Sequence, residues 1–105
     1  MRLVILGCGR SGSTLALMLA SAGHDVTLID RNPDTVRRRL GERSDIRVVL
    51  GNGLDHDILT KAGVSGADAF FALTRGDNTN LMAAQIVQRR FNVQRAVAKV
   101  ADPMR

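Results

Sequence analysis

Apolar residues in this chain gather in short runs, which are separated by stretches of helical length. Runs that are apolar at almost every position are typical of strands covered on both faces of a sheet. The runs predict five strands, at residues 2–6, 25–30, 47–51, 67–73 and 95–100. The stretches between them have apolar residues at helical spacing and predict helices at residues 11–22, 33–42, 56–62 and 78–90. Asp102 and Pro103 are expected to end the regular structure, because the residue before a proline avoids the helical conformation.

Two of the predicted helices carry more apolar residues than one face requires. The helix at residues 11–22 is apolar almost all round, so we expect it to be deeply packed. The helix at residues 78–90, for which Asp77 is the expected N-cap, has apolar side chains on more than one stripe. One stripe must pack on the sheet, and the remainder is either a subunit interface or part of a well-buried helix.

The turn after the first strand carries a glycine motif. Gly7, Gly9 and Gly12 have the spacing G-x-G-x-x-G. The first glycine of such a motif allows a tight turn, the second lets a pyrophosphate approach the backbone, and the third lets the helix pack closely on its strand. The amides and the dipole at the start of the helix attract phosphate. The motif alone is weak evidence, and its meaning depends on its context.

The context of the motif favours a nucleotide site. The motif follows a strand and opens a helix, and the next strand ends in Asp30. This carboxylate would accept hydrogen bonds from adenosine ribose hydroxyls and would repel a 2′-phosphate, which favours NAD over NADP. Arg31 could instead hold a 2′-phosphate, stack on adenine or remain exposed. Together these features predict an α/β fold, a Rossmann-like doubly wound parallel sheet with strand order 3-2-1-4-5 and helices on both faces.

Length, composition and net charge further limit the classes of protein and of binding partner that fit this chain. The chain has 105 residues without a repeat or linker, so residues 1–105 are predicted to form a single domain. No apolar run approaches the ~20 residues of a membrane span, and the lone cysteine, Cys8, suits a reducing cytosol. A net charge of +5 favours anionic partners such as nucleotides, anionic lipid or nucleic acid. The arginine-rich segment has no aromatic residues, which argues against stacking on single-stranded nucleic acid.

Charged and reactive residues near the motif each allow two interpretations. Arg10 either adds charge to the phosphate site or is a solvated loop residue. Cys8 could have a lowered pKa at the helix start and a redox role, or could be a small residue that fits the turn. A basic patch is either a solvated surface or a contact with an acidic partner or membrane; it comprises Arg31, Arg37, Arg38, Arg39, Arg43 and Arg47.

The chain resembles the N-terminal Rossmann domain of the Trk and Ktr potassium-uptake regulators, called KTN, RCK-N or TrkA-N. The resemblance spans essentially the whole chain, and the combination of segments is more specific than the glycine motif alone. The matching segments are residues 7–12, 29–30, 51–55, 68–69, Thr74 with Asp77 and Asn80, and residues 97–100 before Asp102 and Pro103.

The resemblance implies a set of cofactor-binding residues. The glycine turn would hold the phosphates with help from Arg10, Asp30 would hold the ribose, and residues 51–52 would line the adenine pocket. Residues 73–74 would line the centre of the site. The full implied set is Gly7, Cys8, Gly9, Arg10, Ser11, Gly12, Asp30, Arg31, Gly51, Asn52, Leu73, Thr74 and Lys99, with no catalytic and no metal-binding residue.

Two departures from the family pattern leave the ligand open. Asn52 stands where an aspartate is usual, and Lys99 stands where the family often has an arginine, so the bidentate guanidinium is absent. The expected cofactor is NAD or NADH, with ATP or ADP as the alternative. Family members continue into a sixth strand, a dimerising helix and a C-terminal domain, so we expect a truncated member. Because Met1 directly precedes the first strand, we expect a separate cytosolic subunit rather than a domain fused to a channel.

The resemblance implies a regulatory protein that is not an enzyme. Nucleotide binding would bias a homo-oligomer, a dimer or ring, that contacts a membrane potassium transporter or channel at its cytosolic face. The protein would be cytoplasmic, at the inner face of the membrane, and would bind no nucleic acid. One alternative is the cofactor domain of an NAD-dependent oxidoreductase, although the chain offers no catalytic constellation. Another is a scaffold with a degenerate site, against which the intact glycine motif and Asp30 argue.

Overall fold

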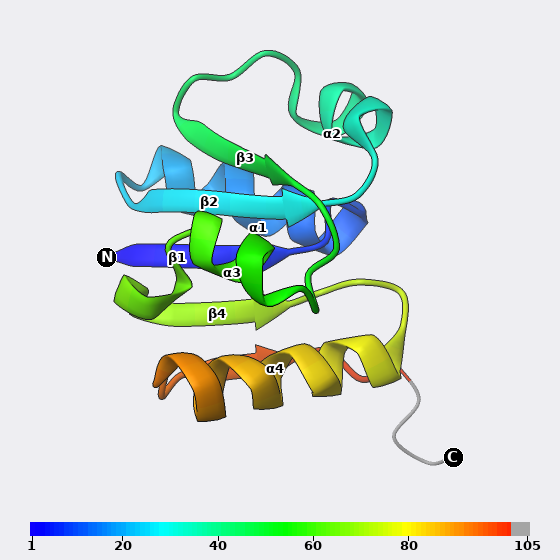
Figure 1. Cartoon of the computed structure of the whole chain (residues 1–105). Helices are drawn as coiled ribbons and strands as arrows, with labels where there is room; N and C mark the ends of the chain where they lie inside the picture. The colour runs from blue at the N-terminus through cyan, green and yellow to red at the C-terminus, as the bar shows by residue number, and fades with distance from the viewer. Residues whose placement is uncertain (102–105) are drawn as a thin grey trace.

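The computed structural model describes residues 1–101 and has one all-parallel sheet of five strands. The strand order is β3-β2-β1-β4-β5, which confirms the predicted fold class (Figure 1). The strands are β1 (Arg2–Leu6), β2 (Asp25–Asp30), β3 (Ile46–Leu50), β4 (Ala69–Ala72) and β5 (Ala96–Ala98). The predicted end of regular structure at Asp102 and Pro103 lies outside the described residues.

Helices cover both faces of the sheet (Figure 1). One face carries α1 (Arg10–Ser21) and α2 (Pro33–Leu40); the other carries α3 (His56–Lys61), the short 3-10 helix η1 (Val64–Gly66) and α4 (Asp77–Phe91). The sequence predicted these helices except η1, a single turn that lies between α3 and β4. Within residues 1–101, no helix combines the length and apolar character needed to cross a membrane.

The alternation of side chains along each strand divides the core into two clusters. On β1, Val4 and Leu6 face the cluster under α3 and α4, whereas Ile5 faces the cluster under α1 and α2. Phe70 of β4 is fully buried in the first cluster, to which Val87 of α4 also belongs. Because both faces are covered, the central strands read as continuous apolar runs, which is the pattern that predicted them.

Helix α1 is less buried than its composition predicts. Its buried residues are Gly12, Ser13 and Ala16, whereas the side chain of Met18 is 64% exposed. The helix packs against β1, β2 and α2 with its small residues. Within residues 1–101, no element covers its other side. The prediction of a deeply packed helix was therefore wrong, because it depended on a neighbour that the described chain does not provide.

Helix α4 begins one residue earlier than the sequence indicated. Gly76 is its N-cap, and Asp77 is its first helical residue. The Oδ1 atom of Asp77 accepts a hydrogen bond of 2.9 Å from the backbone N–H of Ala101, so this residue holds the segment after β5 against α4. Leu81 and Met82 are 43% and 51% exposed, so the apolar residues of α4 extend beyond the face that packs on the sheet.

Candidate functional site

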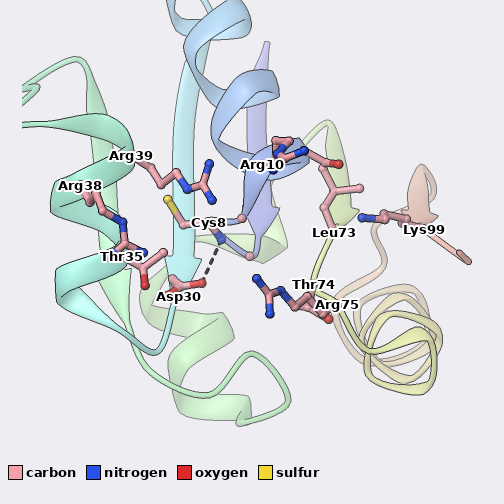
Figure 2. A pocket seen from close by; sticks show the side chains of 13 residues that line it. Cys8, Arg10, Asp30, Thr35, Arg38, Arg39, Leu73, Thr74, Arg75 and Lys99 are labelled. Atoms are coloured by element: carbon pink, nitrogen blue, oxygen red, sulfur yellow. Dashed lines mark hydrogen bonds between the residues drawn. The ribbon is translucent and has the colours of Figure 1, made fainter.

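A cavity of about 620 Å³ opens where the carboxyl ends of β1, β2 and β4 meet. Its size is in the usual range for sites that bind small molecules, and in an open parallel sheet ligands bind at this edge. Its walls come from the turn after β1, the end of β2, α2, the loop after β4 and the residue after β5 (Figure 2). The lining residues are Gly7, Cys8, Gly9, Arg10, Ser11, Asp30, Thr35, Arg38, Arg39, Leu73, Thr74, Arg75 and Lys99.

The glycine turn is shaped by two close approaches. Gly7 has φ of +106°, and a Cβ atom there would lie 3.0 Å from the backbone of Leu73 and Thr74. A Cβ atom on Gly12 would lie only 1.8 Å from the carbonyl oxygen of Gly7. These positions therefore require glycine, because a side chain would separate the start of α1 from the turn and from the end of β4.

Gly9 has a different environment from the other two glycines of the motif. It is the N-cap of α1, and a Cβ atom at this position would meet no atom within 4 Å. Among the described residues, no side chain caps this helix end. The first N–H groups of α1 therefore face an open space at the positive end of the helix dipole, an arrangement that suits a phosphate group.

Asp30 joins the glycine turn to the loop that begins α2. Its Oδ1 atom accepts a hydrogen bond of 2.9 Å from the Cys8 N–H, and its Oδ2 atom accepts one of 2.9 Å from the Asn32 N–H. The side chain of Asn32 in turn accepts bonds from the amides of Asp34 and Thr35 and so caps α2. Each carboxylate oxygen of Asp30 has a further lone pair, so the residue can still accept hydrogen bonds from a ligand.

The thiol of Cys8 is not activated. Its side chain is fully buried, and burial raises its pKa above the ordinary value, while the nearby charge of Asp30 raises it further and the charge of Arg39 opposes the shift. The thiol is therefore protonated at neutral pH. This finding corrects the sequence-based idea that the start of the helix lowers the pKa, because desolvation outweighs the favourable charges.

Asn80, from α4, fixes the opposite wall of the cavity. It is fully buried, and its Oδ1 atom accepts bonds from the N–H (2.9 Å) and hydroxyl (2.7 Å) of Thr74. Its Nδ2 atom donates to the carbonyl oxygens of Thr74 (3.0 Å) and Lys99 (2.9 Å). The amide therefore joins α4 to the loop after β4 and to the residue that follows β5. Both Thr74 and Lys99 line the cavity.

The structure brings most of the predicted site residues together, while four of them lie elsewhere. Gly12 lies behind the turn, against Gly7. Arg31 is exposed and does not line the cavity. Gly51 and Asn52 also lie outside its lining; the Asn52 side chain accepts a bond of 2.9 Å from the Leu54 N–H within its own turn. The predicted residues that do line the cavity are Gly7, Cys8, Gly9, Arg10, Ser11, Asp30, Leu73, Thr74 and Lys99.

Sequence reasoning missed four lining residues: Thr35, Arg38, Arg39 and Arg75. It treated residues 37–39 as one basic surface, but the helix separates them. Arg37 lies 3.6 Å from Asp34 in an exposed ion pair, whereas Arg38 and Arg39 line the cavity. No sequence pattern marked Thr35, so its helical spacing to Arg38 and Arg39, at positions i+3 and i+4, becomes informative only once the structure places Thr35 at the cavity.

The cavity is strongly basic. Within residues 1–101, none of its basic side chains pairs with a carboxylate within 4 Å, and no group of three potential metal ligands occurs. Among the described residues that line the cavity, Asp30 is the only acidic one. The excess of positive charge attracts anions such as phosphates. The basic side chains are those of Arg10, Arg38, Arg39, Arg75 and Lys99.

Comparison with known proteins identifies the family. The family model for the TrkA-N domain matches residues 3–105. The chain belongs to the TrkA-N family. This family's domain is a nucleotide-binding domain, in agreement with the glycine turn, Asp30 and the basic cavity at the carboxyl ends of the strands.

The curated relatives of this TrkA-N chain are longer proteins. It is 47% identical over 105 residues to the Trk system potassium uptake protein TrkA of Streptomyces coelicolor, and the match covers all of this chain and 47% of that protein. It is 39% identical over 103 residues to a protein of the same name from Vibrio alginolyticus, covering 98% of this chain and 22% of that protein. The chain thus spans less than half the length of these relatives.

A solved structure has the same fold as the TrkA-N chain. It is that of the Kef CTD of Shewanella denitrificans in an AMP-bound form, with a TM-score of 0.78. The match covers 91% of this chain and 57% of that one, at 18% sequence identity. At this identity the likeness concerns the fold.

Proposed function

We propose that this TrkA-N domain is the nucleotide-sensing part of a regulator of potassium uptake and that it is not an enzyme. The observation that carries the proposal is the cavity in which the uncapped start of α1 lies beside Asp30, under an excess of basic side chains. The names of the curated relatives support the link to potassium uptake.

The proposed ligand is NAD or NADH, with ATP or ADP as the alternative. Its phosphates lie at the start of α1, where the amides of the turn and Arg10 supply positive charge. Asp30 accepts hydrogen bonds from the ribose, and the adenine extends toward Gly51 and Asn52. Leu73, Thr74 and Lys99 contact the central part of the ligand. The Kef CTD, which shares this fold, was solved in an AMP-bound form, and this supports an adenine nucleotide as the ligand.

The chemistry of the lining supports sensing rather than catalysis. Both oxygens of the Asp30 carboxylate already accept backbone hydrogen bonds, and the Cys8 thiol is buried with a raised pKa. Neither group suits a proton transfer or a nucleophilic attack. A bound nucleotide would instead connect the turn after β1, α2 and the loop after β4, which can bias one arrangement of a larger assembly over another.

The proposed partner is a membrane potassium transporter or channel, contacted at its cytosolic face. The regulator would then be a cytoplasmic protein at the inner surface of the membrane, and it would act as a homo-oligomer. The exposed apolar side chains of Met18 on α1 and of Leu81 and Met82 on α4 offer surfaces for such association.

Calorimetric titration with NAD, NADH, ATP and ADP tests the nucleotide site. In the Asp30→Asn variant we expect the affinity for the preferred nucleotide to fall about tenfold, because the ribose loses a charged acceptor. Asp34→Asn is the matched control, since Asp34 is an exposed acid of α2 outside the cavity. The nucleotide affinity of this variant should equal that of wild type. Wild-type protein that binds none of the four nucleotides would contradict the proposal.

A further inference from the structure

We propose that Arg38 and Arg39 of α2, together with Thr35, form a subsite for a phosphate group on the adenosine ribose. The site would then accept nucleotides with a 2′-phosphate, such as NADP and NADPH, at least as well as NAD and NADH. This inference rests on the proposed nucleotide site and adds the residues that would bind a phosphate group on the ribose.

The two sides of the cavity carry separate groups of basic residues (Figure 2). Arg38 and Arg39 approach from α2, on the side of Asp30, and the side chain of Arg39 extends toward Cys8 (Figure 2). Arg10, Arg75 and Lys99 lie on the other side (Figure 2). The uncapped start of α1 and Arg10 can serve a diphosphate without help from α2. The pair on α2 is therefore available for a different anionic group, near the ribose.

Hydrogen bonds to the backbone fix the start of the helix that carries the pair. Asp30 accepts a hydrogen bond from the Asn32 N–H, and the Asn32 side chain accepts one from the Thr35 N–H, so the start of α2 is tied to the predicted ribose acceptor. Arg38 and Arg39 follow Thr35 by three and four residues, which places the three side chains on one face of α2. All three line the cavity. Their common face therefore lies on the ribose side of the site.

The pair also has the charge that a phosphate needs. Within residues 1–101, neither arginine pairs with a carboxylate within 4 Å. Asp30, the one acid among the described lining residues, has both oxygens engaged with backbone amides, and two guanidinium groups outweigh its single charge. Arginine binds a phosphate through two parallel hydrogen bonds, and the Thr35 hydroxyl can donate a third.

With this arrangement, Asp30 is no longer expected to exclude ligands that carry a 2′-phosphate. An acid at the end of the second strand ordinarily disfavours a 2′-phosphate, and holding such a phosphate was one of the three roles left open for Arg31. Arg31 does not line the cavity, whereas Arg38 and Arg39 do. The positive charge that offsets Asp30 therefore comes from later turns of α2. Because these residues are not next to Asp30 in the sequence, the sequence alone did not connect them with it.

The test is calorimetric titration of the whole chain with three pairs of ligands: 5′-AMP and adenosine 2′,5′-bisphosphate, NADH and NADPH, and ADP and ATP. In wild-type protein we expect the bisphosphate to bind about tenfold more tightly than 5′-AMP, and NADPH to bind at least as tightly as NADH. The double variant Arg38→Gln/Arg39→Gln should lose the gain from the 2′-phosphate, so that its affinity for NADPH falls about tenfold more than its affinity for NADH. Arg37→Gln, on the outer face of the same helix, should behave as wild type.

Three results would overturn the subsite. Wild-type protein could bind the 2′-phosphorylated ligands more weakly than their partners. The double variant could weaken both members of each pair equally, which would indicate a general effect of charge. The loss could also fall on ATP relative to ADP, which would assign the arginines to the terminal 5′-phosphate. If the wild-type protein binds NADH and ADP in these cases, the subsite fails and the nucleotide site stands; if the wild-type protein binds no nucleotide, both fail.

Discussion

Asp30 organises the site at the scale of single residues before any ligand is bound. Its two oxygens hold the amides of Cys8 and Asn32 and so fix the glycine turn relative to the start of α2. The turn itself depends on glycines that have different tasks. Gly12 provides contact with Gly7, whereas Gly9 leaves space in front of the start of α1. Packing and binding can therefore be separated by single substitutions.

Replacement of these two glycines by alanine should affect different properties: stability at Gly12 and nucleotide affinity at Gly9. Gly12→Ala places a Cβ atom against the Gly7 carbonyl and should lower the free energy of unfolding by about 3 kcal/mol or prevent folding. Gly9→Ala meets no neighbouring atom, so its free energy of unfolding should change by less than about 1 kcal/mol. Its affinity for nucleotide should fall, because the new methyl group occupies the approach to the helix start. Chemical denaturation and calorimetry measure the two effects; equal stability of both variants would contradict this account.

Cys8 should make the stability depend on pH in the alkaline range. Folding raises the pKa of its thiol above the ordinary value of 9.0, mainly through burial. The folded state therefore favours the protonated thiol, and this contribution is present below about pH 9 and is lost as the pH rises through the higher, folded-state pKa. Melting temperatures measured from pH 8 upward should fall more steeply for wild type than for Cys8→Ala. Parallel curves would show that the thiol does not titrate in this way.

At the scale of elements, the site is assembled by polar links between segments that are distant in sequence. Asn80 connects α4 with the loop after β4 and with the end of β5, and Asp77 connects the start of α4 with Ala101. These two residues belonged to a recognisable sequence signature, but their spacing did not reveal what they bind. Their role is to position cavity residues, since neither lines the cavity itself.

Replacement of Asn80 should damage stability and binding together. Asn80→Ala leaves the partly buried polar groups of Thr74 and Lys99 without their partner, which should lower the free energy of unfolding by about 2 kcal/mol. The loop after β4 loses its fixed position, so nucleotide affinity should also fall at temperatures where the variant remains folded. Asn78→Ala is the control, because Asn78 is exposed on the same helix. Wild-type stability of Asn80→Ala in urea denaturation would be inconsistent with this role.

At the scale of the whole molecule, the sequence predicted the sheet and its strand order because both depend on local patterns. Apolar runs mark strands covered on both faces, and the glycine turn identifies the first strand. What escaped prediction depends on contacts between segments. The burial that raises the pKa of Cys8, the exposure of Met18 and the direction of Arg38 and Arg39 follow from how α1 and α2 pack on the sheet. Sequence spacing alone does not contain that information.

We expect the chain to bind an adenine nucleotide reversibly and without transforming it. The most direct measurement is a titration of the wild-type chain with NADH, followed by the fluorescence of the reduced nicotinamide, with displacement by ADP and with Asp30→Asn as the comparison. We expect saturable binding, displacement by ADP, about tenfold weaker binding by the variant, and a constant amount of NADH over the course of the experiment. Absence of saturable binding, or steady oxidation of NADH by the chain, would rule out a nucleotide sensor that is not an enzyme.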